Sequence, residues 1–266
     1  MGVMDEIVRP AIDACVMSDP RTAHGLKLGY EWSYVREKIL RKGLADFRKG
    51  YVPENSAAGP ELSAADVVLL YCFGNMKRHF PAARNVFEAH RNLIQQCIEN
   101  TANLVVVDVG CGPATGYLAL TDVFPGHAFR YYGVDCAEAM REMAARFSRL
   151  LIGHRFVSPG SQSYFYDTWD KVRPDDWQRD TTVLFIFSYL FASLDRRACV
   201  SLLESVQRIR GHASVVKCFL AYMNSERDIA NDTYRTCFRP GLGLPDQVLS
   251  PMKQYAALFE FLDISR

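Results

Sequence analysis

The sequence predicts an α/β protein with a doubly wound, mostly parallel sheet and an N-terminal helical appendage. Apolar runs of strand length alternate with helical stretches from residue 103 onward, and most connections between them are short. A glycine-rich turn lies between the first of these runs and a helix. Residues 1–100, by contrast, show no convincing ladder of strands. Alternation of this kind favours parallel strands joined by right-handed helical crossovers.

The composition is that of an ordinary globular protein. Of the 266 residues, 49% are hydrophobic and 23% are charged, which suits one large domain or a core with an appendage. The formal charge of +1 gives no global attraction to nucleic acid or membranes. No apolar stretch approaches the roughly 18 residues that a membrane helix needs. Acids stand at the N-terminus, where a signal peptide carries basic residues. We therefore expect a cytoplasmic protein.

The cysteine pattern argues against disulfides and metal. None of the eight cysteines is paired as C-x-x-C, and no Cys/His cluster has zinc spacing. Several lie in apolar runs, where a thiol behaves as a small hydrophobe. We expect reduced, mostly buried thiols and no metal site.

The N-terminal third predicts helices. Apolar residues recur at helical spacing in three segments: 31–47, 63–73 and 82–98. Ser63 is a plausible N-cap for the second segment. Residues 51–60 are rich in Pro, Gly, Asn and Ser and predict a loop. We expect 1–100 to form a helical region that covers the cofactor or walls the substrate pocket, and 101–266 to form the core.

The core elements are expected in alternating order. The predicted strands are 103–109, 129–135, 153–158, 182–188 and 213–221. The predicted helices are 114–123, 137–151 and 194–210. A polar and aromatic segment, 159–180, separates the third strand from the fourth.

The glycine turn after the first strand predicts a nucleoside site. Four apolar residues, 104–107, read as a buried parallel strand, and Asp108 and three glycines follow in the pattern D-x-G-x-G-x-x-x-G. Gly110 and Gly112 allow a sharp turn and a close approach of backbone to ligand. The dinucleotide fingerprint G-x-G-x-x-G also opens a helix after a strand, but here position 115 is Thr.

This pattern resembles the first motif of the class I S-adenosylmethionine-dependent methyltransferases. A second match follows at the family spacing, because residues 129–135 read as a strand that ends in Asp135, and D-x-x-x-x-M runs from Asp135 to Met140. The resemblance implies S-adenosyl-L-methionine as cofactor and a seven-stranded sheet closed by an antiparallel hairpin. Residues 234–238 and 255–262 are the candidate hairpin strands, with a helix as the open alternative.

The resemblance also implies the cofactor contacts. Asp108 would accept a hydrogen bond near the cofactor's amino group, or cap the turn. Asp135 would hold both ribose hydroxyls, since its two carboxylate oxygens can accept from two vicinal donors. Cys136 would pack against adenine. The backbone amides that would face the methionyl group belong to the turn: Gly110, Cys111 and Gly112.

The sequence defines less clearly which residues would contact the adenine of the cofactor. Members of the family often carry an acid directly after the third strand. With that strand at 153–158, no acid follows until Asp167. Ser158 is the candidate substitute, with Ser161 and Gln162 as alternatives.

The end of the fourth strand predicts the catalytic pocket. It reads Phe187-Ser188-Tyr189, and both the N/D-P-P-Y pattern of exocyclic-amine methylation and the Pro-Cys of C5-pyrimidine methylation are absent. Ser188 and Tyr189 are therefore the candidate pocket residues, with plain core packing as the alternative.

Three hypotheses for the function remain open, and two of them differ in the class of methyl acceptor. Tyr30, Trp32 and Tyr34 predict an aromatic pocket wall, which favours a small molecule or natural product. An RNA acceptor is the alternative, since residues 21–50 hold eight Lys or Arg against three acids. The patch 77–84 and Phe187-Ser188-Tyr189 also resemble ribosome-assembly methyltransferase-like proteins, although the metal-binding cysteines of part of that group have no counterpart. The alternative to an RNA-linked role for this patch is that His79 is an ordinary surface residue. The third hypothesis is a cofactor-binding regulator without transfer activity.

Overall fold

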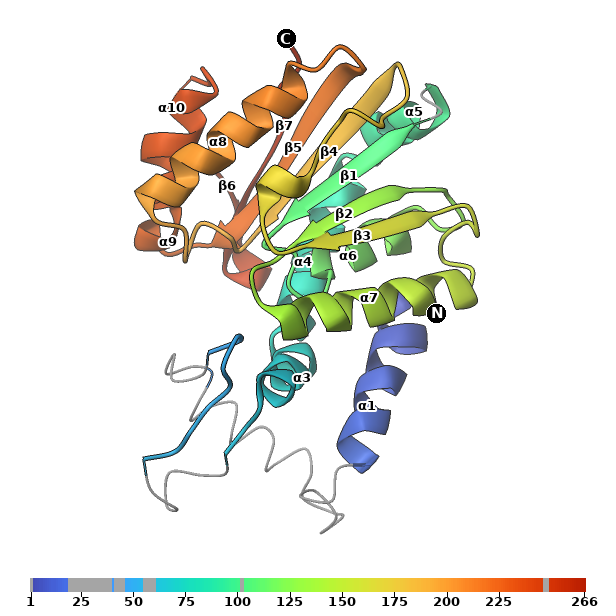
Figure 1. Ribbon diagram of the computed structural model, residues 1–266, viewed down its shortest axis with the longest axis vertical. Coiled ribbons are helices and arrows are strands. Elements are labelled where there is room, and N and C mark those ends of the chain that lie inside the picture. Colours follow the sequence, from blue (N-terminus) through green and yellow to red (C-terminus); the bar gives the residue numbers. More distant parts are fainter. Residues whose placement is uncertain (1, 19–39, 41–45, 55–60, 101–102, 246–248) are drawn as a thin grey trace.

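The computed structural model describes residues 2–18, 40, 46–54, 61–100, 103–245 and 249–266. Its sheet has seven strands in the order β3-β2-β1-β4-β5-β7-β6 (Figure 1). In chain order they are β1 Leu104–Val109, β2 Arg130–Val134, β3 Gln162–Tyr166, β4 Thr181–Ser188, β5 Val215–Ser225, β6 Ser250–Met252 and β7 Ala257–Asp263. The first five strands are parallel to one another, and β7 is antiparallel to both β5 and β6. The predicted fold class is confirmed.

Helices cover both faces of the sheet, with α8 in front and α6 behind in Figure 1. Alternate residues of each central strand supply the two cores: Val106 faces one layer of helices, and Val105 and Val107 face the other. The first layer contains α3 Ala64–Gly74, α4 Met76–Ala89, α5 Arg91–Asn100, α6 Thr115–Val123 and α7 Glu138–Gly153. The second contains α8 Arg196–Arg210 and a short helical segment, α9 Asp228–Thr233, η6 Tyr234–Phe238 and α10 Arg239–Gly241.

The N-terminal helices pack on the first of these layers. The first helices are η1 Met4–Val8 and α1 Arg9–Ser18, which lie within the predicted helical region 1–100 but before its first predicted helix. The predicted helix at 63–73 is confirmed as α3, and Ser63 forms a capping box with Asp66. The segment 82–98 falls in two helices, α4 and α5, that divide at His90. Most of the predicted helix 31–47 lies outside the described residues.

The predicted third strand at 153–158 is wrong, because β3 lies at 162–166. Helix α7 continues to Gly153, and Arg155 then turns the chain with a φ of +60°. The apolar side chain of Val157 packs in the core between the sheet and the first layer of helices, and the residue is not part of a strand. The aromatic run that starts after Gln162 pairs with β2 instead.

The predicted hairpin is correct in its second strand only. The segment 255–262 overlaps β7, but its hairpin partner is β6 and not 234–238. Tyr234 and Phe238 are one helical turn apart, and both rings contact Phe191 in the second core. Aromatic packing at helical spacing therefore explains why this segment is helical.

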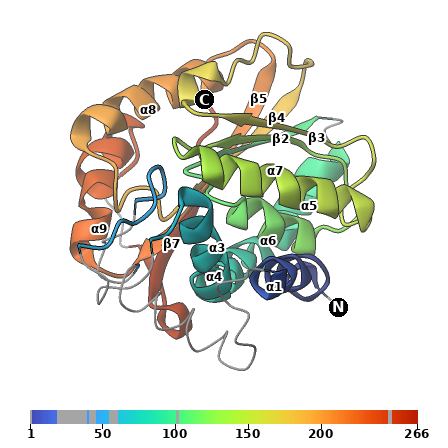
Figure 2. The same cartoon turned by 60° about the horizontal axis from the view of Figure 1, so that its bottom comes forward.

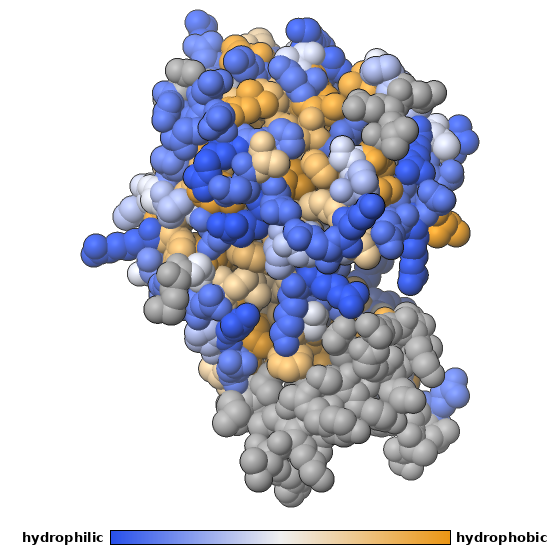
Figure 3. Space-filling model, turned by 180° about the vertical axis from the view of Figure 1, so that it is seen from behind, coloured by the Kyte–Doolittle hydropathy of each residue, from blue (hydrophilic) through white to orange (hydrophobic). Residues whose placement is uncertain are grey.

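The exposed surface carries scattered apolar residues. Hydrophilic side chains surround small apolar areas on the face in Figure 3. The most exposed large apolar side chains, Ile229 at 85% and Val52 at 73%, come from different parts of the chain. Among the described residues, no helix is long and apolar enough to cross a membrane.

Candidate cofactor site and acceptor pocket

The glycine turn lies where the carboxyl ends of β1, β2 and β4 meet. In open α/β sheets this edge is where ligands bind. Gly110 and Gly112 have φ of +69° and +52°, so the turn uses the left-handed conformations that glycine allows. The amides of Gly110 and Cys111 both donate to the carbonyl of Val134, at 2.7 and 3.0 Å. These amides, expected to face a cofactor, thus join the turn to β2 in this structure.

Asp108 is the buried acid at the mouth of this turn. Its Oδ2 accepts a hydrogen bond from the Tyr131 hydroxyl at 3.1 Å. Its Oδ1 is buried and has no partner within the geometric limits of a hydrogen bond among the described residues, although the nearby Tyr117 amide lowers the pKa of this carboxyl group. Burial raises the pKa of Asp108 from 3.8 to about 7. A buried acceptor without a donor fits a ligand amino group, because buried polar groups are almost always paired.

Asp108→Asn is expected to stabilise the ligand-free protein at pH 8 by about 1–3 kcal/mol. Because the pKa is higher in the folded state, the aspartate lowers stability as pH rises from about 4 to 7. Neutral asparagine lacks this effect, so wild type and variant should converge near pH 4. Urea unfolding at pH 4 and pH 8 measures the difference. Equal stabilities at both pH values would show that Asp108 carries no burial penalty.

Asp135 follows β2 and joins the glycine turn to the start of α7 through its two carboxylate oxygens. Oδ2 accepts from the Gly112 amide at 3.0 Å, and Oδ1 accepts from the Ala137 amide at 2.9 Å. Burial raises its pKa, and the two backbone donors oppose that rise. Each oxygen keeps a further acceptor position, so two vicinal hydroxyls can still bind this carboxylate.

The segment 46–54 brings a basic residue to this side of the turn. Figure 2 shows the segment in front of the carboxyl edge. Cys136 raises the pKa of Arg48, and the charge of Asp135 contributes weakly to the same rise, so the guanidinium is on the Asp135 side of the turn. Cys136 itself is exposed. The basic excess around residue 48 was visible in the sequence, but its place beside Asp135 was not.

The adenine candidates lie at the opposite edge of the sheet. Ser158 and Ser161 precede β3, and Gln162 is its first residue, so none of them reaches the carboxyl edge. Asp167 instead follows the last residue of β3 directly and pairs with Lys171 at 2.5 Å. The amide of Asp135 also donates to the carbonyl of Tyr166 at 3.0 Å, which joins the two strand ends. The correct boundary of β3 would have identified Asp167.

Ser188 and Tyr189 lie at the carboxyl end of β4, as expected. Ser188 is the last residue of the strand. Tyr189 has a φ of +59°, and its amide donates to the carbonyl of Met223 at 2.8 Å. A non-glycine residue in the left-handed region is uncommon, and such strain gathers at functional sites.

The ring of Tyr189 belongs to a group of four that we call the aromatic cluster: Phe47, Tyr71, His79 and Tyr189. His79 stacks on Tyr189 with ring centroids 3.7 Å apart and an interplanar angle of 19°. Its Nδ1 is 2.7 Å from the hydroxyl of Tyr71, and Phe47 packs edge-on against Tyr71 at 5.8 Å. The interpretation of His79 as an ordinary surface residue is therefore wrong, since the ring is half-buried between two tyrosines. The expected wall residues Tyr30, Trp32 and Tyr34 lie outside the described residues.

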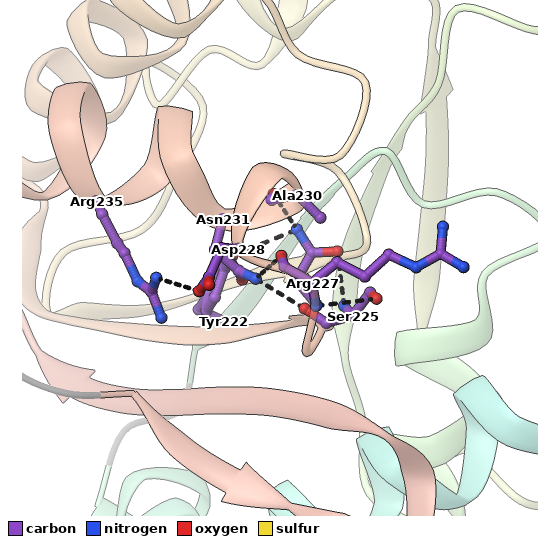
Figure 4. Close-up of polar contacts among 8 residues, drawn as sticks. Tyr222, Ser225, Arg227, Asp228, Ala230, Asn231 and Arg235 are labelled. Atoms are coloured by element: carbon purple, nitrogen blue, oxygen red, sulfur yellow. Dashed lines mark hydrogen bonds and ion pairs between the residues drawn. The ribbon is translucent and has the colours of Figure 1, made fainter.

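The turn after β5 is held rigidly by a buried amide network (Figure 4). The hydroxyl of Tyr222 donates to Asn231 at 2.5 Å. The Asn231 amide donates to the carbonyls of Ser225 and Arg227, both at 2.7 Å. Asn224 donates to the carbonyl of Ala230 at 2.8 Å. Because these buried groups are paired, the network fixes the carboxyl end of β5 beside that of β4.

The part of the chain that the structure describes contains no group of three or more His, Cys, Asp or Glu side chains that could hold a metal ion. Five of the cysteines are buried, in line with the expected hydrophobic role: Cys72, Cys97, Cys111, Cys199 and Cys218.

No family model and no curated protein matches the chain. Solved structures that it resembles include S-adenosylmethionine-dependent methyltransferases. A candidate O-methyltransferase from Nostoc punctiforme has a TM-score of 0.45 and 14% identity, over 98% of this chain and 72% of that one. A methyltransferase from Aquifex aeolicus has a TM-score of 0.39 and 16% identity, over 71% and 97%. The plantazolicin methyltransferase, solved with S-adenosylhomocysteine, has a TM-score of 0.34 and 11% identity, over 85% and 62%. The fold of this chain is the seven-stranded α/β sheet in the order β3-β2-β1-β4-β5-β7-β6.

Proposed function

We propose that this protein is an S-adenosylmethionine-dependent methyltransferase that acts on a small molecule. The observation that carries the proposal is a pair of carboxylates at one glycine turn. Asp108 offers a buried oxygen without a donor, and Asp135 offers acceptor positions for two hydroxyls. A ligand with an amino group and a ribose meets both requirements. Asp167, at the end of the next strand, is the candidate contact for the adenine amine.

The transfer itself needs mainly alignment of the two reactants. The sulfonium of the cofactor supplies an activated methyl group when it is bound, and positioning then accounts for much of the rate. Ser188 and the aromatic cluster lie at the adjoining end of β4, where an acceptor would sit. A half-buried, aromatic surface of this kind favours a small molecule. Tyr30, Trp32 and Tyr34 remain candidates for a further wall of the same pocket.

Asp135→Ala is expected to weaken S-adenosylmethionine binding by about 2–4 kcal/mol, because a charge-assisted contact to two hydroxyls is lost. Titration calorimetry on the folded variant measures this loss. Asp5→Ala is the matched control, since Asp5 forms an exposed ion pair with Arg9 in the N-terminal helix. Unchanged affinity in Asp135→Ala would refute the assignment.

Product formation separates the three functional hypotheses. Release of S-adenosylhomocysteine with a small-molecule extract supports the proposal, and release only with RNA supports the nucleic-acid alternative. Binding without release in either case supports a regulator. An RNA acceptor also predicts salt-sensitive binding that is weakened by changing Arg41, Lys42, Arg48 and Lys49 to Gln.

A further inference from the structure

We infer that His79 accepts the proton of a hydroxyl group on the acceptor, which makes the substrate class an alcohol or phenol. This inference rests on the proposed methyltransferase function. His79 comes from α4, outside the strand ends and turns where such sites are usually sought. Its ring reaches the carboxyl edge of the sheet because it stacks on Tyr189, the residue that follows β4.

The surroundings of His79 place it between the cofactor turn and the end of β4. Tyr71, its hydrogen-bond partner, is close enough to Asp135 and Tyr189 for both to raise its pKa. Tyr71 also lies beside Thr115, the first residue of the helix after the glycine turn. The imidazole is therefore next to the two elements that would hold the cofactor and the acceptor.

The contact of Nδ1 with Tyr71 leaves Nε2, the other nitrogen of the His79 ring, for a substrate. The Nδ1 atom of His79 is 2.7 Å from the Tyr71 hydroxyl oxygen. The inference requires the tautomer in which Nδ1–H donates to this oxygen. Nε2 of His79 then carries a lone pair that the contact with Tyr71 does not use. This tautomer makes Nε2 a proton acceptor and Tyr71 a positioning residue.

A hydroxyl acceptor loses a proton during the transfer, and such a group can take it. A lone pair on the acceptor oxygen forms the bond to the methyl carbon, and the carbon–sulfur bond breaks with its electron pair left on sulfur. The O–H bond breaks with its electrons kept on oxygen, and the proton moves to Nε2 of His79. The products are a methyl ether, S-adenosylhomocysteine and an imidazolium that later gives its proton to water.

Burial makes His79 a weak base, and a weak base is sufficient here. Burial and the nearby charge of Arg78 lower the pKa of His79 to about 4, so the imidazole is neutral near pH 7. An oxygen that is gaining a methyl group is strongly acidic until its proton leaves. Neutral imidazole can take this proton late in the transfer.

The tautomer is the first test, and it needs no acceptor. In protein with ¹⁵N-labelled histidine at pH 7, His79 is expected to carry its proton on Nδ1, with Nε2 unprotonated. His90 is the reference in the same spectrum, because its Nδ1 bonds to the carbonyl of Val86 and must donate. Tyr71→Phe should remove the Nδ1 preference of His79 and leave that of His90 unchanged. A His79 ring protonated on Nε2 would overturn the inference.

The second test compares two histidine variants. His79→Gln is expected to lower methyl transfer to a panel of phenols and alcohols by roughly 10²–10³-fold. Its affinity for S-adenosylmethionine should stay within about twofold of wild type, since the carboxylates that hold the cofactor are untouched. His90→Gln is the matched control, because His90 also stacks on a ring, that of Phe261 at 4.3 Å.

The outcomes separate this inference from the proposed function. Wild-type protein that fails to bind S-adenosylmethionine refutes the function itself. Binding with transfer to matched amines but not to hydroxyls refutes the role of His79 alone. Equal losses of activity in His79→Gln and His90→Gln would also refute the role of His79 alone. If the wild type binds the cofactor and methylates no panel member, the tautomer measurement decides.

Discussion

Gly110→Val is expected to abolish detectable S-adenosylmethionine binding and to leave the sheet folded. Gly110 has a φ of +69°, which a β-branched residue adopts only with strain. A Cβ at this position would also lie 2.9 Å from Cδ1 of Leu190, the residue after Tyr189. The valine would therefore displace the Leu190 side chain and strain the cofactor turn itself. Calorimetry with the cofactor and circular dichroism of the free variant measure the two effects.

Gly126→Val is the matched control for this substitution. Gly126 has a similar φ of +78°, but a Cβ there meets nothing within 4 Å. It lies in the loop before β2, at the edge of the sheet opposite the glycine turn. Both variants thus carry the same backbone strain, and only Gly110→Val disturbs the site. Loss of cofactor affinity in both would mean that strain alone explains the result, and retained affinity in Gly110→Val would place the cofactor elsewhere.

The sequence was sufficient for the parts of the fold with strong local signals. The buried run of β1, the glycine turn and the alternation of β2, β4 and β5 with helices all appear in the structure near their predicted positions. The error at β3 has a tertiary cause. Val157 is apolar because it fills the core beneath a turn, whereas β3 is a half-buried strand at the sheet edge with a mixed composition.

Some residues of the candidate site could likewise be predicted from the sequence, and others could not. Asp108 and Asp135 were accessible to sequence analysis because each follows or ends a recognisable strand. Asp167 was missed since its position depends on the boundary of β3. His79 was missed for a different reason: no local pattern brings α4 to the end of β4. The contact with Tyr189 joins residues 110 positions apart, and only the packing of α4 against the first core creates it.

Arg239→Met is expected to cost about 3–5 kcal/mol of unfolding free energy, because it leaves a buried carboxylate without its partner. The side chains of Arg239 and Glu260 are only 4% and 6% exposed. The guanidinium contacts both carboxylate oxygens, with Nη2 at 2.5 Å from Oε1 and Nε at 3.0 Å from Oε2, and the Tyr234 hydroxyl donates to Oε2 at 2.6 Å. This pair joins α10 to β7, so its loss should loosen the C-terminal hairpin.

Two comparisons distinguish a buried charge from a simple loss of contacts. Arg235→Ala removes the ion pair with Asp228, whose side chain is 92% exposed, and should cost at most about 1 kcal/mol. Adding Glu260→Leu to Arg239→Met should restore part of the lost stability, since the isolated charge is then gone. Urea unfolding of the wild type and the three variants measures these differences. If the double variant is less stable than Arg239→Met alone, the cost lies in packing around the pair and not in the unpaired carboxylate.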